Sequence, residues 1–398
     1  MSELNASNLR KEHGNEGPDL VGVTELTSPY YMVPPSGTTA ERPQNPEPGT
    51  LRFNTDIGSL EYFKGNTLGW ESIDRVYSSI GGVGGQSGSI DGIGARAIFA
   101  GGFIAGSPTN PCFNNVDALT IATLGNTIDF NNLTASLCGG FSVGDSTRAI
   151  HAGGMGPSSH PGPVVNSIQY ATFSTQSDYV DGGDLTGTRA SGAALCDSTR
   201  GLAAGKGYPG YSATIDYWTM QSTGNALDFG DVHTAKGWAN GLMSSTRGLI
   251  AGGIYCCPGV AYNNIEYVTI QTTGDAVDFG DMTAAKYESG SMGNATRGIL
   301  AGGSPTLDVI EYITISTLGN ATDFGDLDSL NGTNKYSASS PTRGVVGGGY
   351  SSPTPYSNII EYIQIATTGN AQDFGDFINF GRRSGSGHGG ISNAHGGL

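Results

Sequence analysis

The most regular feature of the chain is an alternation of apolar and polar residues that recurs in short runs. Residues 264–270 read NIEYVTI, while residues 310–315 and 360–365 read IEYITI and IEYIQI. Successive side chains of a β-strand point to opposite faces of a sheet, so this alternation predicts strands with two different faces. The amphipathic runs of ten or more residues that a helical solenoid needs are not visible. The pattern therefore predicts an all-β fold.

A second kind of run is short, apolar throughout and closed by glycines. Residues 247–253 read RGLIAGG, which is typical of a strand buried inside the fold. Each alternating run is followed by a T-x-G-[ND] turn and then by a DFGD box, as in NALDFGD at residues 225–231. Gly followed by Asn or Asp tolerates positive φ, so these pairs predict hairpin turns.

These segments recur in the same order six times along the chain. Each copy begins at an arginine, and successive arginines lie 46 to 52 residues apart: Arg96, Arg148, Arg200, Arg247, Arg297 and Arg343. Four short antiparallel strands at a spacing of about 50 residues are typical of a propeller blade. The six copies predict a six-bladed β-propeller.

The repeat resembles the Kelch family. Its Gly doublet, its acidic–aromatic pair and its bulky aromatic residue occupy the Kelch positions, here as Gly252-Gly253, Glu266-Tyr267 and Phe279. The sequence departs from that pattern in using Phe where Kelch units often have Trp, and in adding the TRG anchor. The resemblance covers about residues 85–398, and it implies a Kelch-like β-propeller without implying a function.

The strand count predicts how the propeller closes. A small-residue run precedes each anchor arginine, and one further run of this kind, SGHGGISNA, stands at residues 386–394. We expect this last run to complete the blade that begins at Arg96, which would remove open sheet edges. The alternative is closure by N-terminal residues, with a loose C-terminal tail.

The residues before the repeats differ in character, so four segments are predicted. Residues 1–26 form a flexible or partner-ordered arm, and 27–78 form a small module with a Pro-rich arm and a β-hairpin. Residues 79–94 are a Gly-rich linker, and 95–398 are the propeller. Within the module, LRFNTD and SLEYFKG alternate across a turn, and Trp70 closes the hairpin.

The module resembles a short segment of tailed-bacteriophage virion proteins, in particular fibre and structural proteins of marine phages. It matches the pattern R-P-x-x-P-x-x-G-x-[LI]-R-F-N-x-D-x-x-x-L-E-Y-[FY]-x-G-x-x-W, and its marker residues are Arg42, Pro43, Arg52, Phe53, Asn54, Asp56, Tyr62 and Trp70. Kelch-like propellers with IEY and DFGD motifs are likewise similar to virion proteins of phages that infect cyanobacteria. The two resemblances imply a tail-fibre-like virion structural protein, often a trimer.

Charge and composition limit the classes of partner and the cellular location that we expect for the protein. The net charge of −16 disfavours binding to a phosphate backbone, so no nucleic-acid partner is expected. No apolar run approaches 18 residues, and the first 20 residues lack an apolar signal region, so neither membrane insertion nor secretion is expected. The five cysteines match no zinc spacing, which is consistent with synthesis in a reducing host cytoplasm.

The sequence predicts no enzyme, no cofactor and no metal site. DFGD contains the kinase DFG triplet, but it recurs in four near-identical copies, and no phosphate loop or HRD motif accompanies it. No D-x-D-x-D-G calcium loop or H-E-x-x-H motif occurs either. Paired carboxylates of a glycosidase would be invisible in sequence. A propeller-type glycan-degrading phage enzyme and a cellular Kelch-type interaction scaffold therefore remain the alternatives.

Two hypotheses assign roles to the repeated and the variable residues. Each anchor arginine is expected to pair with an acidic residue of its own or the adjacent blade, such as Glu266, Glu311 or Glu361, and so to fix the register between blades. The loops after the Gly doublets, rich in Pro, Tyr, Ser and Asn, are expected to contact a host-surface glycan or protein receptor. Residues 1–78 are expected to contact other virion proteins, on the tail or the capsid exterior.

Overall fold

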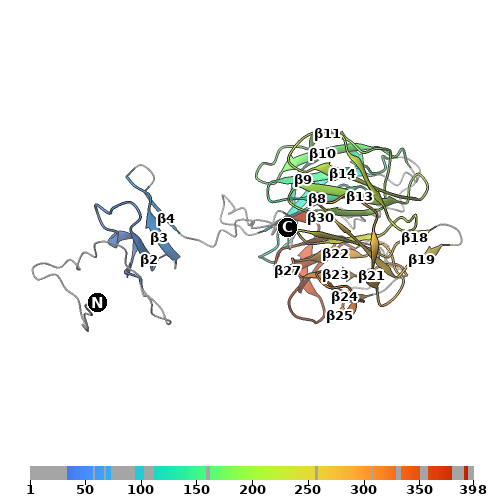
Figure 1. The fold of residues 1–398 in the computed structure, drawn as a ribbon. Coiled ribbons are helices and arrows are strands. Elements are labelled where there is room, and N and C mark those ends of the chain that lie inside the picture. Colours follow the sequence, from blue (N-terminus) through green and yellow to red (C-terminus); the bar gives the residue numbers. More distant parts are fainter. Residues whose placement is uncertain are drawn as a thin grey trace, which may run out of the picture. The chain divides into compact units, whose positions relative to one another are not determined.

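The computed structural model divides the chain into two compact units, Met1–Arg75 and Val76–Leu398, and each unit is described here by itself (Figure 1). The structure describes residues 34–56, 59–66, 69–72, 95–102, 112–157, 162–255, 259–305, 308–328, 333–349, 357–378 and 390–392. The proposed arm at residues 1–26 and the linker at 79–94 lie outside these ranges.

The first unit is a four-stranded sheet in the order β1-β2-β3-β4. The hairpin that the sequence predicted is confirmed: β2 (Leu51–Asn54) pairs antiparallel with β3 (Ser59–Phe63). The strand β4 (Trp70–Ser72) extends the hairpin on one side. On the other side, β1 (Ser36–Gly37) lies parallel to β2 and leads into a 3₁₀ turn, η1 (Thr39–Glu41).

The second unit is all-β, and its described residues form six antiparallel sheets of four strands. Sheet 1 consists of β30 (Gly390–Ser392), β5 (Arg96–Ala100), β6 (Phe113–Thr120) and β7 (Ile128–Leu137). Sheet 2 consists of β8 (Phe141–Gly144), β9 (Arg148–Ala152), β10 (Ser167–Thr172) and β11 (Val180–Asp184). Sheet 3 consists of β12 (Ala193–Cys196), β13 (Arg200–Lys206), β14 (Ser212–Thr219) and β15 (Leu227–Asp231).

The other three sheets repeat this order of strands. Sheet 4 consists of β16 (Asn240–Met243), β17 (Arg247–Ala251), β20 (Asn264–Thr269) and β21 (Val277–Asp281). Sheet 5 consists of β22 (Gly290–Gly293), β23 (Arg297–Ala301), β24 (Val309–Thr314) and β25 (Thr322–Asp326). Sheet 6 consists of β26 (Tyr336–Ser339), β27 (Arg343–Gly347), β28 (Ile359–Gln364) and β29 (Gln372–Asp376).

Two minor strands complete the described secondary structure of the second unit: β18 (Ile254–Tyr255) and β19 (Val260–Ala261) form a small hairpin. None of the described segments is a helix that could cross a lipid bilayer.

The core lies between neighbouring sheets, because the second strands carry mostly apolar residues on both faces. Leu249 and Ile265 of sheet 4, for example, share one buried cluster with Leu300 and Ile313 of sheet 5. The first strands also lie next to one another. The strand β8 contacts β12, and the contacts continue through β16, β22 and β26 to β30, which in turn contacts β8. Figure 1 shows β30 beside β8.

The third strands carry a β-bulge at the same place in all six sheets. In sheet 4 the register shifts between Ile265 and Glu266, so the acidic residue of IEY stands at the irregularity. The other five shifts fall at the equivalent residues, which are Asp117, Gln169, Asp216, Glu311 and Glu361. Bulges re-aim side chains, and these residues are all buried.

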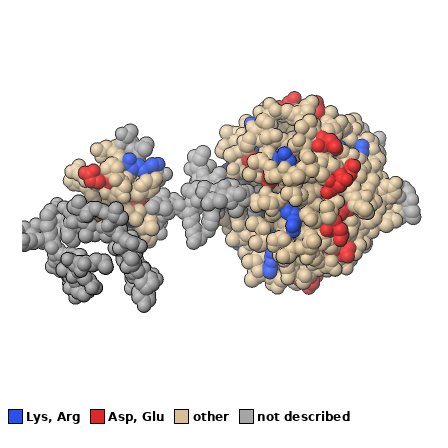
Figure 2. All heavy atoms as spheres, viewed as in Figure 1, with Lys and Arg blue, Asp and Glu red and all other residues tan. Residues whose placement is uncertain are grey.

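The fourth strands form one edge of each sheet and carry exposed acidic residues. In sheet 3, Asp228 and Asp231 are exposed on either side of the buried Phe229. Figure 2 shows acidic side chains gathered in a row on the visible face of this unit. Charges on an edge strand disfavour pairing with the edge of another molecule.

Candidate functional site

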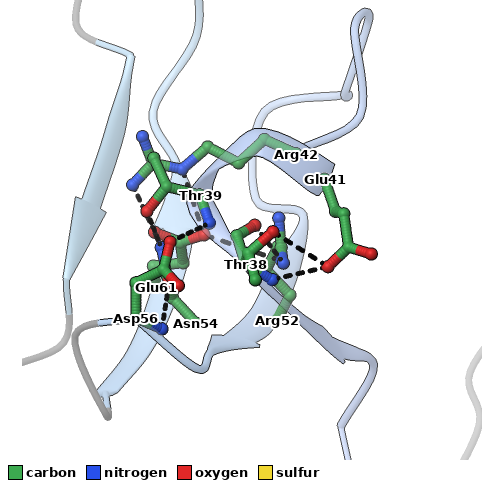
Figure 3. A network of polar contacts seen from close by, with 8 residues as sticks. All are labelled: Thr38, Thr39, Glu41, Arg42, Arg52, Asn54, Asp56 and Glu61. Carbon is green, nitrogen blue, oxygen red and sulfur yellow. Dashed lines mark hydrogen bonds and ion pairs between the residues drawn. The ribbon is translucent and has the colours of Figure 1, made fainter.

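Three residues of the N-terminal motif, Arg42, Arg52 and Asn54, meet around one buried carboxylate, that of Glu61 on β3 (Figure 3). The guanidinium of Arg42 donates two hydrogen bonds to this carboxylate, from Nε to Oε1 at 3.2 Å and from Nη2 to Oε2 at 2.6 Å. Asn54 Nδ2 donates to Oε2 at 3.1 Å. Such a forked contact fixes both distance and orientation. The Arg42 hydrogen bonds are the largest cause that lowers the pKa of Glu61, and Glu61 in turn raises the pKa of Arg42.

A second arginine lies on the other side of this carboxylate. Arg52 is the register partner of Glu61 across the hairpin, and its Nε lies 3.6 Å from Oε1. Arg52 Nη2 also donates to Thr38 O at 2.9 Å, which ties the chain before the 3₁₀ turn to the sheet. The indole of Trp70 packs beside both guanidinium groups, with ring-centre distances of 5.8 Å to Arg42 and 6.0 Å to Arg52.

The turn before the hairpin is held by further polar contacts (Figure 3). Thr39 N donates to Asp56 Oδ2 at 2.8 Å, and Asp56 N donates to Asn54 Oδ1 at 3.0 Å. Thr38 N donates to Glu41 Oε2 at 2.7 Å, which lowers the pKa of the Glu41 carboxyl. The motif therefore specifies a folded unit with a defined polar interior.

Five of the eight marker residues belong to this network: Arg42, Arg52, Asn54, Asp56 and Trp70. The other three lie apart from the carboxylate. Pro43 is exposed, Phe53 is half-buried and bonds to Pro35 through its backbone, and Tyr62 is half-buried beside Lys64. The motif pattern contains Glu61 as the acid of L-E-Y, but sequence reasoning assigned it no role, although its place opposite Arg52 in the predicted hairpin was a usable signal.

In the second unit the anchor arginines lie on aromatic rings of their own sheet. In sheets 2 to 6 the guanidinium carbon lies 4.3 to 4.7 Å from the ring centre of the tyrosine on the third strand. In sheets 3 to 6 that tyrosine also meets the DFGD phenylalanine edge to face, at 5.9 to 6.2 Å. The IEY and DFGD motifs thus supply the aromatic support that orients the arginine.

Each anchor arginine reaches the next sheet, but its partner is a backbone carbonyl. The Nη1 atoms of Arg96, Arg148, Arg200, Arg247, Arg297 and Arg343 donate, in that order, to the carbonyl oxygens of Phe173, Met220, Ile270, Ile315, Ile365 and Ile121. Each of these carbonyls directly follows the third strand of the next sheet, and Arg343 of sheet 6 reaches sheet 1. The predicted pairing of these arginines with the IEY acids is therefore wrong for Glu266 and Glu311, because lysines occupy these two carboxylates.

The cations that do bind these acids come from the chain that follows the fourth strand of the preceding sheet. Lys236 Nζ lies 2.7 Å from Glu266 Oε1, and Lys286 Nζ lies 2.8 Å from Glu311 Oε1. The guanidinium of Arg189 bonds to Asp216 at 3.0 Å. All six side chains of these pairs are buried. Each pair joins one sheet to the next, so an inter-sheet ion pair exists where one was predicted, but with a different cation.

Backbone donors from the same segments complete the carboxylate contacts. His233 N donates to Glu266 Oε2 at 3.0 Å, and Asp328 N donates to Glu361 Oε1 at 2.7 Å. Burial lowers the pKa of Lys236 and Lys286, while the neighbouring carboxylate acts in the opposite direction. Burial likewise lowers the pKa of Lys335, near Glu361, to about 8.

The T-x-G-[ND] turns dock on the DFGD box of the preceding sheet. In sheet 4, Gly274 N donates to Phe229 O of sheet 3 at 2.8 Å, and Asp275 Oδ1 accepts from Asp231 N at 3.0 Å. Gly230 of that box has φ +146°, and a Cβ there would lie 2.5 Å from Gly274 O. The glycine of DFGD is therefore required by the close approach of the next turn.

The same docking joins sheet 6 to sheet 1. Gly125 N donates to Phe374 O at 3.0 Å, and Asn126 Oδ1 accepts from Asp376 N at 3.0 Å. The predicted receptor loops after the Gly doublets fall partly outside the described residues, because residues 103–111, 158–161, 256–258 and 350–356 are not described.

Comparison with known families finds no family whose sequence model matches this chain. A search of curated proteins finds no match either.

Proposed function

We propose that this protein is a structural component of a tailed-phage virion. The first unit would dock on other virion proteins, and the second unit would be displayed on the particle exterior for host-surface adhesion or particle decoration. The observation that carries the proposal is the network around Glu61: three motif residues that the resemblance singled out, Arg42, Arg52 and Asn54, contact one buried carboxylate. A motif whose residues hold the fold of its own unit supports a module that can be joined to different distal domains.

The displayed unit, in this proposal, is a closed six-bladed β-propeller in which each four-stranded sheet is one blade. Three sets of contacts support closure, because each set runs from one sheet to the next and also from sheet 6 to sheet 1. They are the arginine-to-carbonyl bonds, the docking of the turn on the DFGD box, and the contacts between first strands. The pairing of β30 with β5 supports a closure made by the C-terminal strand.

The acidic surface supports an exterior role. Exposed aspartates on the fourth strands keep neighbouring copies from pairing edge to edge, which matters for a protein displayed at high local density. Recognition of a glycan or protein receptor would then fall to the loops after the Gly doublets, and the assembly would be a homo-oligomer, as in the trimeric fibres that the module resembles.

Two measurements test this function. Gold-labelled antibody against the second unit should decorate purified particles of the phage that encodes the chain, and unlabelled particles would refute a virion location. The purified protein should also bind host-envelope polysaccharide without releasing reducing ends. Release of reducing ends would instead support the glycan-degrading alternative.

The module's role is tested separately. Glu61→Gln should impair incorporation into particles while leaving polysaccharide binding by the second unit unchanged. The matched control is Glu47→Gln, a change at an exposed side chain before β2. Equal incorporation of both variants would contradict a docking role for the network.

A further inference from the structure

One position in sheet 1 breaks the pattern of the other five sheets. The third strands of sheets 2 to 6 carry a tyrosine directly after the bulge: Tyr170, Tyr217, Tyr267, Tyr312 and Tyr362. The strand register places Ala118 at the equivalent position of sheet 1. Ala118 pairs with Ile98 and Ile128, just as Tyr267 pairs with Leu249 and Val277.

The arginine and the phenylalanine that surround this tyrosine in other sheets are nevertheless present in sheet 1. Arg96 stands where the other anchor arginines stand, and its guanidinium carbon lies 5.3 Å from the ring centre of Phe130. In sheet 4, by comparison, Arg247 lies 4.6 Å from the ring of Tyr267 and 5.8 Å from that of Phe279. The arginine and the phenylalanine of the stack are therefore both present in sheet 1.

A pocket borders Ala118, which is itself 1% exposed. Its volume is about 210 Å³, and its lining includes Arg96, Ala118, Thr120, Leu124 and Ile128. Ala118 is packed on its inner side within the cluster that contains Phe130 and Tyr179. Leu124 and Ile128 are 61% and 57% exposed, so the pocket is reached from solvent under the turn of sheet 1.

We propose that this pocket is a binding site for a single aromatic ring of the phenol class. Five equivalent positions in the same molecule hold such a ring against an arginine, so the chemistry of the lining is already matched to it. An enclosed apolar cavity of about 150 Å³ admits benzene in another protein. This pocket is larger, but it is open to solvent and part of its lining is polar. The cationic face of Arg96 favours a π system over an aliphatic ring of equal size.

The probe for the test is p-cresol, which is the side chain of tyrosine as a free molecule. Ligand-observed NMR and calorimetry on the full chain should detect one site, and cyclohexanol should bind at least tenfold more weakly. Ala118→Tyr restores the intramolecular ring and should abolish the site. Thr120→Phe fills the pocket from its rim and should do the same if the first variant does not fold.

The matched control is a variant that should gain a second binding site. Tyr267→Ala creates the same vacancy in sheet 4, so this variant should bind two equivalents of p-cresol. Comparing free p-cresol with a short tyrosine-containing peptide distinguishes a small-molecule ligand from a partner's side chain. Failure of the unaltered protein to bind p-cresol, equal binding of cyclohexanol, or undiminished binding by folded Ala118→Tyr would each overturn the proposal.

Discussion

The buried pair of Lys236 and Glu266 offers the most direct test of how neighbouring sheets are joined. Substituting Lys236→Met keeps the length and apolar stem of the side chain but removes its charge. The carboxylate of Glu266, 2% exposed, then remains between sheets 3 and 4 without the ammonium group 2.7 Å away. We expect the variant to unfold more readily than the unaltered protein.

The magnitude follows from what is left around the carboxylate. Removing one partner of a buried ion pair destabilises a protein by about 3–5 kcal/mol, because the remaining charge is uncompensated. Glu266 keeps two donors, Asn264 Nδ2 at 2.6 Å and His233 N at 3.0 Å. These retained hydrogen bonds favour the lower end of the range, about 3 kcal/mol.

The assay is urea unfolding followed by far-ultraviolet circular dichroism at pH 7. The double variant Lys236→Met with Glu266→Gln should recover most of the loss, because it leaves no buried charge. The matched control is the exposed Asp228→Asn, which should change the unfolding free energy by less than about 0.5 kcal/mol. The reasoning is refuted if Lys236→Met unfolds at the same urea concentration as the unaltered protein, or if the double variant is no more stable than the single one.

Three further predictions concern other contacts. Burial lowers the pKa of His151 from 6.5 to about 4, so His151 binds a proton in the unfolded chain at a higher pH than in the folded protein. The unfolding free energy should therefore drop by about 3 kcal/mol between pH 6.5 and 4. His151→Gln should flatten this pH profile, while a substitution at the exposed His233, His233→Gln, should not. The pKa of Glu61 is lowered in the fold, so the first unit should lose stability as pH falls below about 4.5. Glu61→Gln should reduce this dependence and leave the part due to Glu41, whose pKa is also lowered; the measurement is a thermal melt followed by Trp70 fluorescence in a chain whose other two tryptophans, Trp218 and Trp238, are replaced by Phe. Arg247→Met removes a 2.8 Å hydrogen bond to Ile315 O and a cation–π contact, so it should lower the unfolding free energy in urea by about 1.5–3 kcal/mol. An unchanged urea midpoint would show that this arginine does not help to hold sheet 4 to sheet 5.

The strands could be predicted from the repeat, because the alternating runs and the fully apolar runs are both set by local chemistry. Alternating and fully apolar runs became the third and second strands, as in Asn264–Thr269 and Arg247–Ala251. The N-terminal hairpin was equally predictable. Counting the small-residue runs also anticipated that residues 390–392 would pair with the strand that begins at Arg96.

The contacts between sheets were harder to predict, for physical reasons. A backbone carbonyl accepts hydrogen bonds in any sequence, so nothing in the sequence identified Ile315 O as the partner of Arg247. The true cations had a weak signal: Arg189, Lys236 and Lys286 each lie five residues after the last aspartate of the fourth strand. Lys335 does not follow this spacing, because a longer segment separates it from the fourth strand of its sheet.

The arrangement of the six sheets around a common axis is the claim on which the account of the second unit depends. An experimental density map of the purified protein at a resolution that separates strands tests it most directly. The account predicts six four-stranded sheets in an unbroken ring, with Arg343 of sheet 6 against the chain at Ile121 of sheet 1. A gap between sheets 6 and 1, or a different number of sheets, would contradict it.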